Sequence, residues 1–350
     1  MSVLRLLLIP ALGAGLVTPL VAQQAAQPDA RGSQVASVDL AAVKRLIDRG
    51  QPQEALHQLD ALAAQQPHTE GIDRLRGMAL YAEGDFPAAD EALTKALTEN
   101  SKDVEAAEMK GLTLFRMGRC ADAIPLLEGI HEWVPGAKVD PSYVLALCYL
   151  DTRRYDDARH AFAQQFGFEP NSASAYLLAG RMLLRHEYLP IAQQYAKKAV
   201  ELDPKLPLGH LLLGEIALAG EHLDDAIAEF EKERALNPMN PAIYDRLGDA
   251  YTRAGQYQKA LRSLQQAVLL EPYSTGPYIL LGKVMLKQQD AASAAMYLER
   301  AEKMDPANYM THSLLGQAYR AMGRTADASH ETETAEKLQA ASAPKLETPH

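Results

Sequence analysis

Residues 241–272 read PAIYDRLGDAYTRAGQYQKALRSLQQAVLLEP, and this stretch decides the fold of the whole chain. It contains a motif of fixed spacing, Tyr244-x2-Leu247-Gly248-x2-Tyr251, which is followed by Gly255, Ala260, Leu264, Ala267 and Pro272. A motif of this kind indicates a repeat protein when it recurs along the chain at a constant period.

The same motif recurs with a period of 34 residues over about residues 36–338. Only one junction, around residues 136–138, carries an extra residue. The comparison predicts nine units, which start near Ala36, Glu70, Val104, Val139, Ala173, Pro207, Pro241, Thr275 and Tyr309.

Three columns of the alignment carry the repeat. An alanine occupies one column in all nine units: Ala55, Ala89, Ala123, Ala158, Ala192, Ala226, Ala260, Ala294 and Ala328. A glycine occupies another in seven units: Gly77, Gly111, Gly180, Gly214, Gly248, Gly282 and Gly316. A proline closes seven units: Pro67, Pro135, Pro170, Pro204, Pro238, Pro272 and Pro306. With roughly one residue in six being alanine, nine matches in one register would arise by chance about once in ten million.

The spacing resembles the tetratricopeptide repeat, a helix–turn–helix unit of 34 residues. The resemblance implies an all-α, right-handed solenoid of nine helical hairpins. Glycine inside a helix costs about 1 kcal/mol relative to alanine, so we expect the glycine and alanine columns to allow close helix packing. Aspartates such as Asp122, Asp156, Asp224 and Asp290 are predicted to cap second helices.

The two ends of the chain differ from the repeats. Met1 to Ala22 has one charge, Arg5, an apolar run and a plausible cleavage site, which predicts a secretory signal peptide. Residues 23–35 are expected to form a flexible lead-in, and residues 339–350 a disordered tail. We therefore expect export to the periplasm or the cell exterior, and no membrane insertion after the signal is removed.

Composition excludes several classes of protein. The chain has 35 basic and 45 acidic residues, a net charge of −10, which argues against a nucleic-acid partner because phosphate binding needs a basic surface. No H-E-x-x-H, G-x-S-x-G or phosphate-binding loop is present in the sequence. We therefore expect no catalytic residues, no metal site and no cofactor.

The chain has two cysteines, Cys120 and Cys148. They are expected in neighbouring units, Cys120 at the start of a second helix and Cys148 within the following first helix. In an exported protein they could form a disulfide. The alternative is that both are small buried apolar residues with free thiols.

In tetratricopeptide proteins the first helices line the concave surface, which commonly binds peptides or partner helices. Transferred to this sequence, the resemblance predicts a basic groove over the fifth to ninth units, with charged residues Arg181, Arg185, Arg253, Lys283, Lys287 and Arg320. Its apolar lining is predicted to be Leu177, Leu184, Leu211, Leu218, Ile279 and Leu286. Glu215, Asp245 and Asp249 interrupt it. Cations in the last turn of a helix also complement the helix dipole, which is a structural explanation for Arg185, Arg253, Lys287 and Arg320.

The carboxylate clamp of chaperone-binding members requires an asparagine in the column that holds Arg181 and Lys283. No unit has one, so we do not expect that activity. The predicted function is a non-enzymatic scaffold that binds proteins or peptides along its concave face. The alternatives are a structural subunit of an envelope secretion, pilus or polysaccharide-export assembly, and an enzyme or enzyme accessory, such as a carbohydrate-active or peptidase-linked protein.

Overall fold

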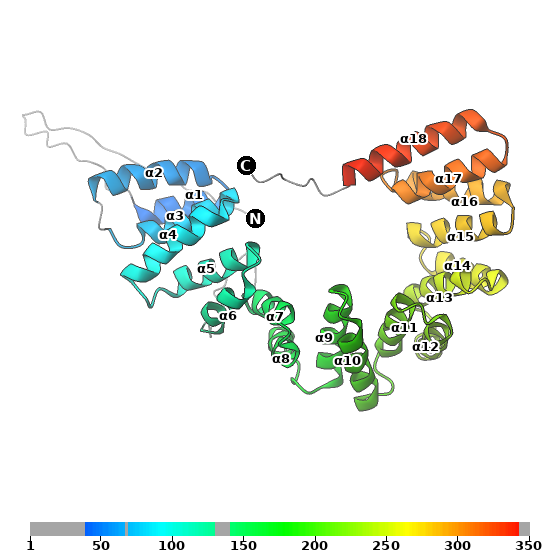
Figure 1. Cartoon of the computed structure of the whole chain (residues 1–350), viewed down its shortest axis with the longest axis horizontal. Helices are drawn as coiled ribbons and strands as arrows, with labels where there is room; N and C mark the ends of the chain where they lie inside the picture. The colour runs from blue at the N-terminus through cyan, green and yellow to red at the C-terminus, as the bar shows by residue number, and fades with distance from the viewer. Residues whose placement is uncertain (1–38, 67–68, 130–140, 343–350) are drawn as a thin grey trace, which may run out of the picture.

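The computed structural model describes residues 39–66, 69–129 and 141–342, and every regular element in these ranges is an α-helix. The predicted signal peptide and lead-in lie outside the described residues, as do the irregular junction near residue 137 and residues 343–350 of the predicted tail. The helices pair into consecutive antiparallel hairpins that stack along an open arc (Figure 1). The prediction of an all-α helical repeat is confirmed.

Eighteen helices lie within the described residues. The first helices of the units are α1 (Leu40–Asp48), α3 (Ile72–Glu83), α5 (Val104–Arg116), α7 (Pro141–Asp151), α9 (Ala173–Arg185), α11 (Gly209–Ala219), α13 (Pro241–Arg253), α15 (Thr275–Lys287) and α17 (Tyr309–Ala321). The second helices are α2 (Pro52–Gln65), α4 (Phe86–Glu99), α6 (Cys120–Glu128), α8 (Tyr155–Phe166), α10 (Leu189–Leu202), α12 (Leu223–Leu236), α14 (Tyr257–Leu270), α16 (Ala291–Met304) and α18 (Thr325–Ser342).

The unit boundaries agree closely with the sequence period. Five first helices begin at the predicted residue, namely α5, α9, α13, α15 and α17. The C-terminal boundary is different, because α18 continues to Ser342 although disorder was predicted from Gln339. The helix continues because residues 335–341 contain no helix breaker and the next proline is Pro344.

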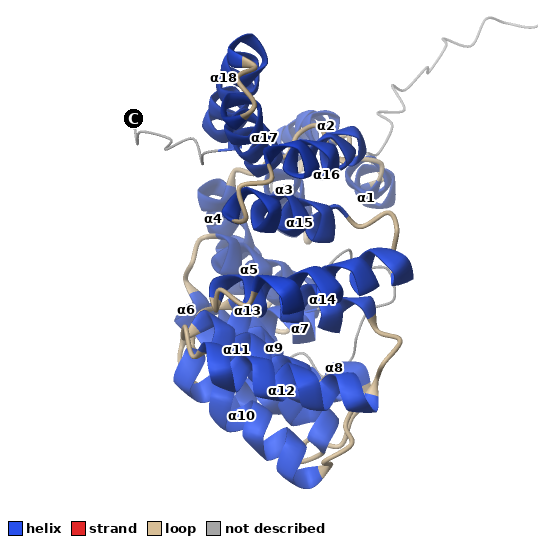
Figure 2. Ribbon diagram, turned by 90° about the vertical axis from the view of Figure 1, so that its right-hand side faces the viewer, coloured by secondary structure: helices blue, strands red, loops and turns tan. Residues whose placement is uncertain are grey.

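First helices form the inner layer of the arc. Each first helix packs on its own second helix. First helices of neighbouring units also contact one another, as α9 does with α11 and α13 does with α15, at every junction except that of α7 and α9, where such contacts are sparse. No comparable set of contacts joins consecutive second helices in the described part of the chain. The first helices are thus closer together than the second helices, which curves the stack toward the first-helix side (Figures 1 and 2).

The glycine column makes the closest contact within each hairpin. A Cβ atom added to Gly248 would lie 2.3 Å from Cδ2 of Leu264, and one added to Gly214 would lie 2.4 Å from the ring of Phe230. Gly77, Gly111 and Gly282 face a leucine in the same way. The space left by the missing Cβ atom is therefore filled by a large apolar side chain, sixteen residues after the glycine. The alanine column is buried in all nine units, at 0–2% exposure.

Helix capping agrees only in part with the sequence prediction. Asp290 is the N-cap of α16, where its side chain accepts a hydrogen bond from the Ser293 backbone N–H at 3.1 Å. Asp122, Asp156 and Asp224 instead lie in the first turns of α6, α8 and α12. Their charges still favour the helix N-terminus, although they are not the capping residues.

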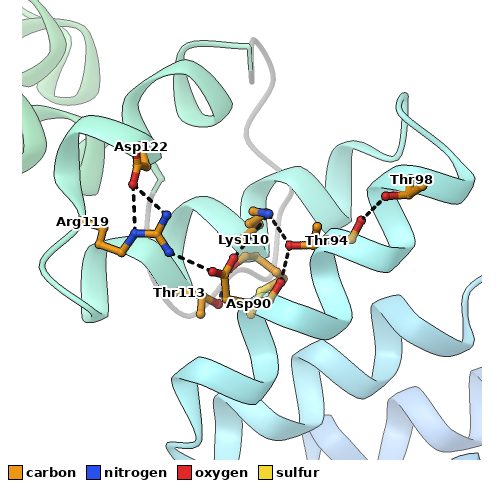
Figure 3. Close-up of polar contacts among 8 residues, drawn as sticks. Asp90, Thr94, Thr98, Lys110, Thr113, Arg119 and Asp122 are labelled. Atoms are coloured by element: carbon orange, nitrogen blue, oxygen red, sulfur yellow. Dashed lines mark hydrogen bonds and ion pairs between the residues drawn. The ribbon is translucent and has the colours of Figure 1, made fainter.

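Ion pairs link the N-terminal units to one another. Asp90 of α4 binds Lys110 of α5 at 3.3 Å and Arg119, the N-cap of α6, at 3.0 Å. Arg119 also binds Asp122 at 2.8 Å, so one guanidinium joins the second helix of one unit to that of the next (Figure 3). Thr94 contributes a hydroxyl that donates to the Asp90 carbonyl oxygen. This network fixes the start of α6.

A buried histidine joins the two helices of the last hairpin, α17 and α18. His312 of α17 is 4% exposed, and its Nδ1 lies 2.6 Å from a carboxylate oxygen of Glu331 in α18. Its Nε2 lies 2.9 Å from the carbonyl oxygen of Pro306. Because both ring nitrogens face acceptors, the arrangement fits a protonated imidazolium that donates twice. Burial opposes this charge, but the hydrogen bonds outweigh burial and raise the pKa of His312.

We expect Gly248→Ala to destabilise the chain. The new methyl group would overlap Leu264, and overpacking of this kind costs typically about 1–3 kcal/mol, against roughly 1 kcal/mol gained in helix propensity. The midpoint of urea unfolding should fall in Gly248→Ala, and the same change should lower it less when it is made in a Leu264→Ala background, where the overlap is absent. Gly276→Ala is the matched control, because its Cβ would meet only Asp245 at 3.6 Å. A Gly248→Ala chain as stable as the control would contradict the packing argument.

We also expect the C-terminal hairpin to lose stability as pH rises. The folded pKa of His312 is raised, so its ion pair is fully present below the ordinary histidine pKa of about 6.5 and is lost as pH rises through the folded value. The melting temperature of the native chain should therefore fall more between pH 6 and pH 9 than that of His312→Gln. His330→Gln, an exposed change on α18, should keep the native pH dependence. Parallel pH profiles of the native chain and His312→Gln would refute this role.

Candidate concave binding surface

The inner surface changes character along the arc. In the first three units its cations are paired between helices: Lys44 of α1 binds Glu105 of α5, and Arg74 of α3 binds Asp103 at 3.0 Å and Glu105 at 3.3 Å. These contacts join both α1 and α3 to the start of α5. Little positive charge is left over in this part of the inner surface.

A hollow of about 540 Å³ lies further along, between α9, α11 and α13. Four arginines and two carboxylates line it, together with two leucines and an alanine. The lining residues are Arg181, Leu184, Arg185, Glu215, Leu218, Ala219, Arg246, Asp249 and Arg253. Three of the predicted groove cations, Arg181, Arg185 and Arg253, are therefore brought together, in a chain that is acidic as a whole.

Glu215 forms ion pairs with two of the arginines that line the hollow. Its carboxylate lies 2.9 Å from Nε of Arg246 and 3.7 Å from Nη2 of Arg181, so it connects α11 to both neighbouring first helices. Burial would lower the pKa of Arg246, but the hydrogen bond to Glu215 and the nearby acidic groups raise it overall. Arg181 Nη2 is buried and has no hydrogen-bond partner, because Glu215 is too distant for one.

A second acidic pair lies on α13. Asp249 contacts Arg253 through two atoms, at 3.1 and 3.3 Å, which holds this guanidinium against its own helix. Asp245 lies 3.6 Å from Arg246 on the same helix, and burial raises the pKa of its carboxyl group. The acidic residues of α13 therefore neutralise part of the basic lining.

Arg185 differs from the other three arginines. It lies exposed in the last turn of α9, and no hydrogen bond or ion pair engages it within the described residues. Lys283 and Lys287 of α15 also have no ion-pair partner there, although they lie outside the hollow. Arg320 of α17 points toward the terminal helix, where its Nη2 lies 3.5 Å from the Thr332 hydroxyl.

The predicted apolar lining is only partly correct. Leu177, Leu184 and Leu286 are half-buried and retain exposed surface, whereas Leu211, Leu218 and Ile279 are buried at 4%, 7% and 7% exposure. Leu211 and Leu218 belong to the core between α11, α12 and α13. Neighbouring first helices lie close enough to enclose most of the surface of these side chains. Of the six predicted apolar residues, only Leu184 and Leu218 line the hollow.

Arg246 was missed by the sequence prediction. It occupies a column in which every other unit has an apolar residue: Ala41, Leu75, Met109, Val144, Leu178, Leu212, Leu280 and Leu314. A single arginine in an apolar column is a signal that the sequence does contain. Such a residue requires a partner, and Glu215 provides it.

A buried glutamate positions α11, which carries Glu215. α11 starts after Leu208, whose φ of 68° is left-handed, and it has no side-chain N-cap of its own. Glu233 of α12, which is fully buried, accepts hydrogen bonds instead from the backbone N–H groups of Leu208, His210 and Leu211, at 2.8–3.2 Å. α12 thus supplies the N-terminal cap of α11 and fixes the position of α11 in the hollow.

One group of possible metal ligands occurs in the ranges that the structure describes: Glu302, His312 and Glu331. The 2.6 Å separation of His312 Nδ1 and Glu331 fits a hydrogen bond. Two ligands placed tetrahedrally at about 2.0–2.2 Å from one ion would lie more than 3 Å apart. The geometry therefore favours a shared proton, and no metal site is assigned there. Within the described residues, no helix is both long and apolar enough to cross a membrane.

Comparison with known proteins agrees with this architecture. Models described as tetratricopeptide repeat match residues 40–87, 74–133, 114–181, 211–277 and 279–343. No curated protein sequence matches the chain.

Several solved structures are similar to it. MamA from Desulfovibrio magneticus RS-1 is 20% identical, with 49% of this chain and 97% of MamA covered and a TM-score of 0.45. YrrB, described as a TPR protein with an unusual peptide-binding site, is 20% identical, with 53% and 94% covered and a TM-score of 0.43. A tetratricopeptide repeat protein from Parabacteroides merdae ATCC 43184 is 17% identical, with 80% and 96% covered and a TM-score of 0.41.

The family models cover more than half of the chain. The chain belongs to the tetratricopeptide repeat family.

Proposed function

We propose that the chain is an exported, non-enzymatic scaffold that holds an acidic segment of a partner protein along its inner surface. The observation that carries the proposal is the hollow between α9, α11 and α13, where four arginines face two carboxylates. A region with excess guanidinium groups inside an acidic chain attracts anions locally, although the molecule as a whole repels them.

The hollow suits a carboxylate of a partner better than an apolar anchor. Arg185 has no partner within the described residues, and the buried Nη2 of Arg181 has no hydrogen-bond acceptor. Guanidinium groups bind carboxylates through two parallel hydrogen bonds, which gives direction as well as attraction. Leu184 offers apolar surface beside them. An acidic residue flanked by aliphatic residues fits this combination.

The acidic residues of the hollow set its selectivity. Glu215 and Asp249 already engage three of the four arginines, so a bound carboxylate competes with them. Binding is then moderate in strength and decreases with salt, because the charges are partly exposed. These are properties of a reversible peptide-binding surface.

Export is the second part of the proposal, and it rests on the sequence of residues 1–22. The apolar run with a single preceding charge supports secretion to the periplasm or the cell exterior. The absence of catalytic motifs from the sequence supports a binding role over a catalytic one.

We expect Arg185→Glu to weaken binding of an acidic peptide by about ten-fold, because the change replaces attraction by repulsion at a partly exposed site. The probe is a fluorescent peptide in which glutamate alternates with leucine, and fluorescence anisotropy gives its affinity. Arg262→Glu is the matched control, since Arg262 is exposed on α14, has no ion-pair partner among the described residues and gives the same change in net charge. Equal affinities of the two variants would exclude the hollow as the binding site.

We expect the opposite effect from Glu215→Gln. Removing this carboxylate frees Arg181 and Arg246 for the peptide, so affinity should rise several-fold and depend more steeply on salt. The same peptide with glutamine in place of glutamate should bind neither variant measurably. Equally tight binding of a short single-stranded DNA would show that the hollow recognises negative charge in general, which contradicts a protein partner.

Export has its own test. The full chain, expressed in a bacterial host with a cell envelope, should appear outside the cytoplasm with Gln23 as its first residue, as N-terminal sequencing would show. Retention in the cytoplasm with residues 1–22 attached would disprove export and leave the binding proposal intact.

A further inference from the structure

The two cysteines of the chain lie on two packed helices at the junction between the third and fourth units. Cys120 is the first residue of α6, and Cys148 lies in α7, which packs against α6. Both side chains are buried, at 5% and 0% exposure, and both are free thiols in the structure. They belong to the same apolar cluster.

The two thiols lie near enough across the junction to influence each other's ionisation: Cys148 favours the ionised form of Cys120, whereas Cys120 disfavours that of Cys148. Burial is the largest influence on both groups and raises the pKa of each. Of the two, Cys120 is therefore the sulfur that ionises first.

This proximity is unusual for two residues placed without a joint role. A buried residue touches about 6–12 others, so a second cysteine placed at random in a chain of this length would meet the first in roughly 2–3% of cases. At the corresponding positions of the sixth and seventh units the chain has Leu223 and Ala250, which lie in one apolar cluster. The repeat thus brings these two positions together, and only this junction carries cysteine at both.

The surrounding structure fixes both residues. Arg119, directly before Cys120, is held by Asp90 and Asp122 at 3.0 and 2.8 Å, as Figure 3 shows. The carbonyl oxygen of Cys148 accepts hydrogen bonds from the backbone N–H and the hydroxyl of Thr152, the residue after α7, at 3.0 and 2.8 Å.

We propose that Cys120 and Cys148 form a disulfide that joins the third and fourth units when the chain folds in an oxidising compartment. The oxidant is a disulfide compound of the glutathione type. The Cys120 thiolate attacks it, forms a mixed disulfide and releases one thiol. The Cys148 thiolate then attacks the Cys120 sulfur and releases the second thiol. Two protein thiols are oxidised, and one disulfide of the oxidant is reduced to two thiols.

The bond would strengthen the one junction that departs from the 34-residue period. It closes a loop from residue 120 to residue 148, which contains the extra residue near position 137. Closing a loop of about 30 residues shifts the folding equilibrium of the enclosed region by roughly a hundred-fold or more. The proposal does not depend on what the hollow between α9 and α13 binds.

The test is oxidative refolding of the full chain. Protein unfolded in urea with reductant is refolded in equal concentrations of reduced and oxidised glutathione, and its free thiols are counted after denaturation. We expect fewer than one thiol in ten to remain, no glutathione adduct, and a proteolytic fragment in which the peptides of Cys120 and Cys148 are joined. The oxidised chain should melt at a higher temperature than the reduced chain.

Cys120→Ser and Cys148→Ser are the matched controls, and each should melt at the same temperature in both buffers. The proposal is overturned if the refolded, helical chain retains two thiols or carries glutathione on single cysteines. If refolding fails, the folded chain is oxidised directly with diamide and counted in the same way. Two thiols left after that treatment would equally overturn the proposal.

Discussion

The contact between a first-helix glycine and a large side chain sixteen residues later controls the geometry of each hairpin. At Gly248 a single added carbon atom would lie 2.3 Å from Leu264, so the two helices approach as closely as the absence of a Cβ allows. The alanine in the first turn of the second helix is buried in every unit for the same reason. Since the closeness recurs in most units, the hairpins are nearly identical and can stack in one direction. The curvature of the arc results from adding the small rotation between each hairpin and the next.

This constraint explains where charge can accumulate. Hairpins that stack through their apolar faces leave one row of first helices on the inner side, and charged side chains on that row either pair with the next unit or remain free. The first three units pair their cations across the junctions, through Glu105 and Asp103. Around α9 the acidic residues are fewer than the arginines, and a basic hollow results.

Sequence periodicity was sufficient to predict the helical hairpins, their number and most of their boundaries, because glycine, alanine and proline act locally on backbone geometry. It was less successful for the inner surface. Leu211 and Ile279 occupy groove positions in the alignment but are enclosed by neighbouring units, and the distance between units is a tertiary property that no single copy encodes. The same is true of Glu233, whose role as the cap of α11 depends on which carboxylate the packing brings to that helix end.

Arg246 shows how a departure from the repeat can identify a site before the structure is known. Its column is apolar in all other units, so the arginine brings a charge to a half-buried position and needs a partner. Glu215, in a column of mixed character, provides that partner from the preceding unit, and Arg181 of the fifth unit approaches the same carboxylate from the other side. In a repeat protein the columns describe how the units fold. A charged residue in an apolar column, such as Arg246, carries a cost of burial that the repeat itself does not require, so it points to a role beyond the folding of its own unit.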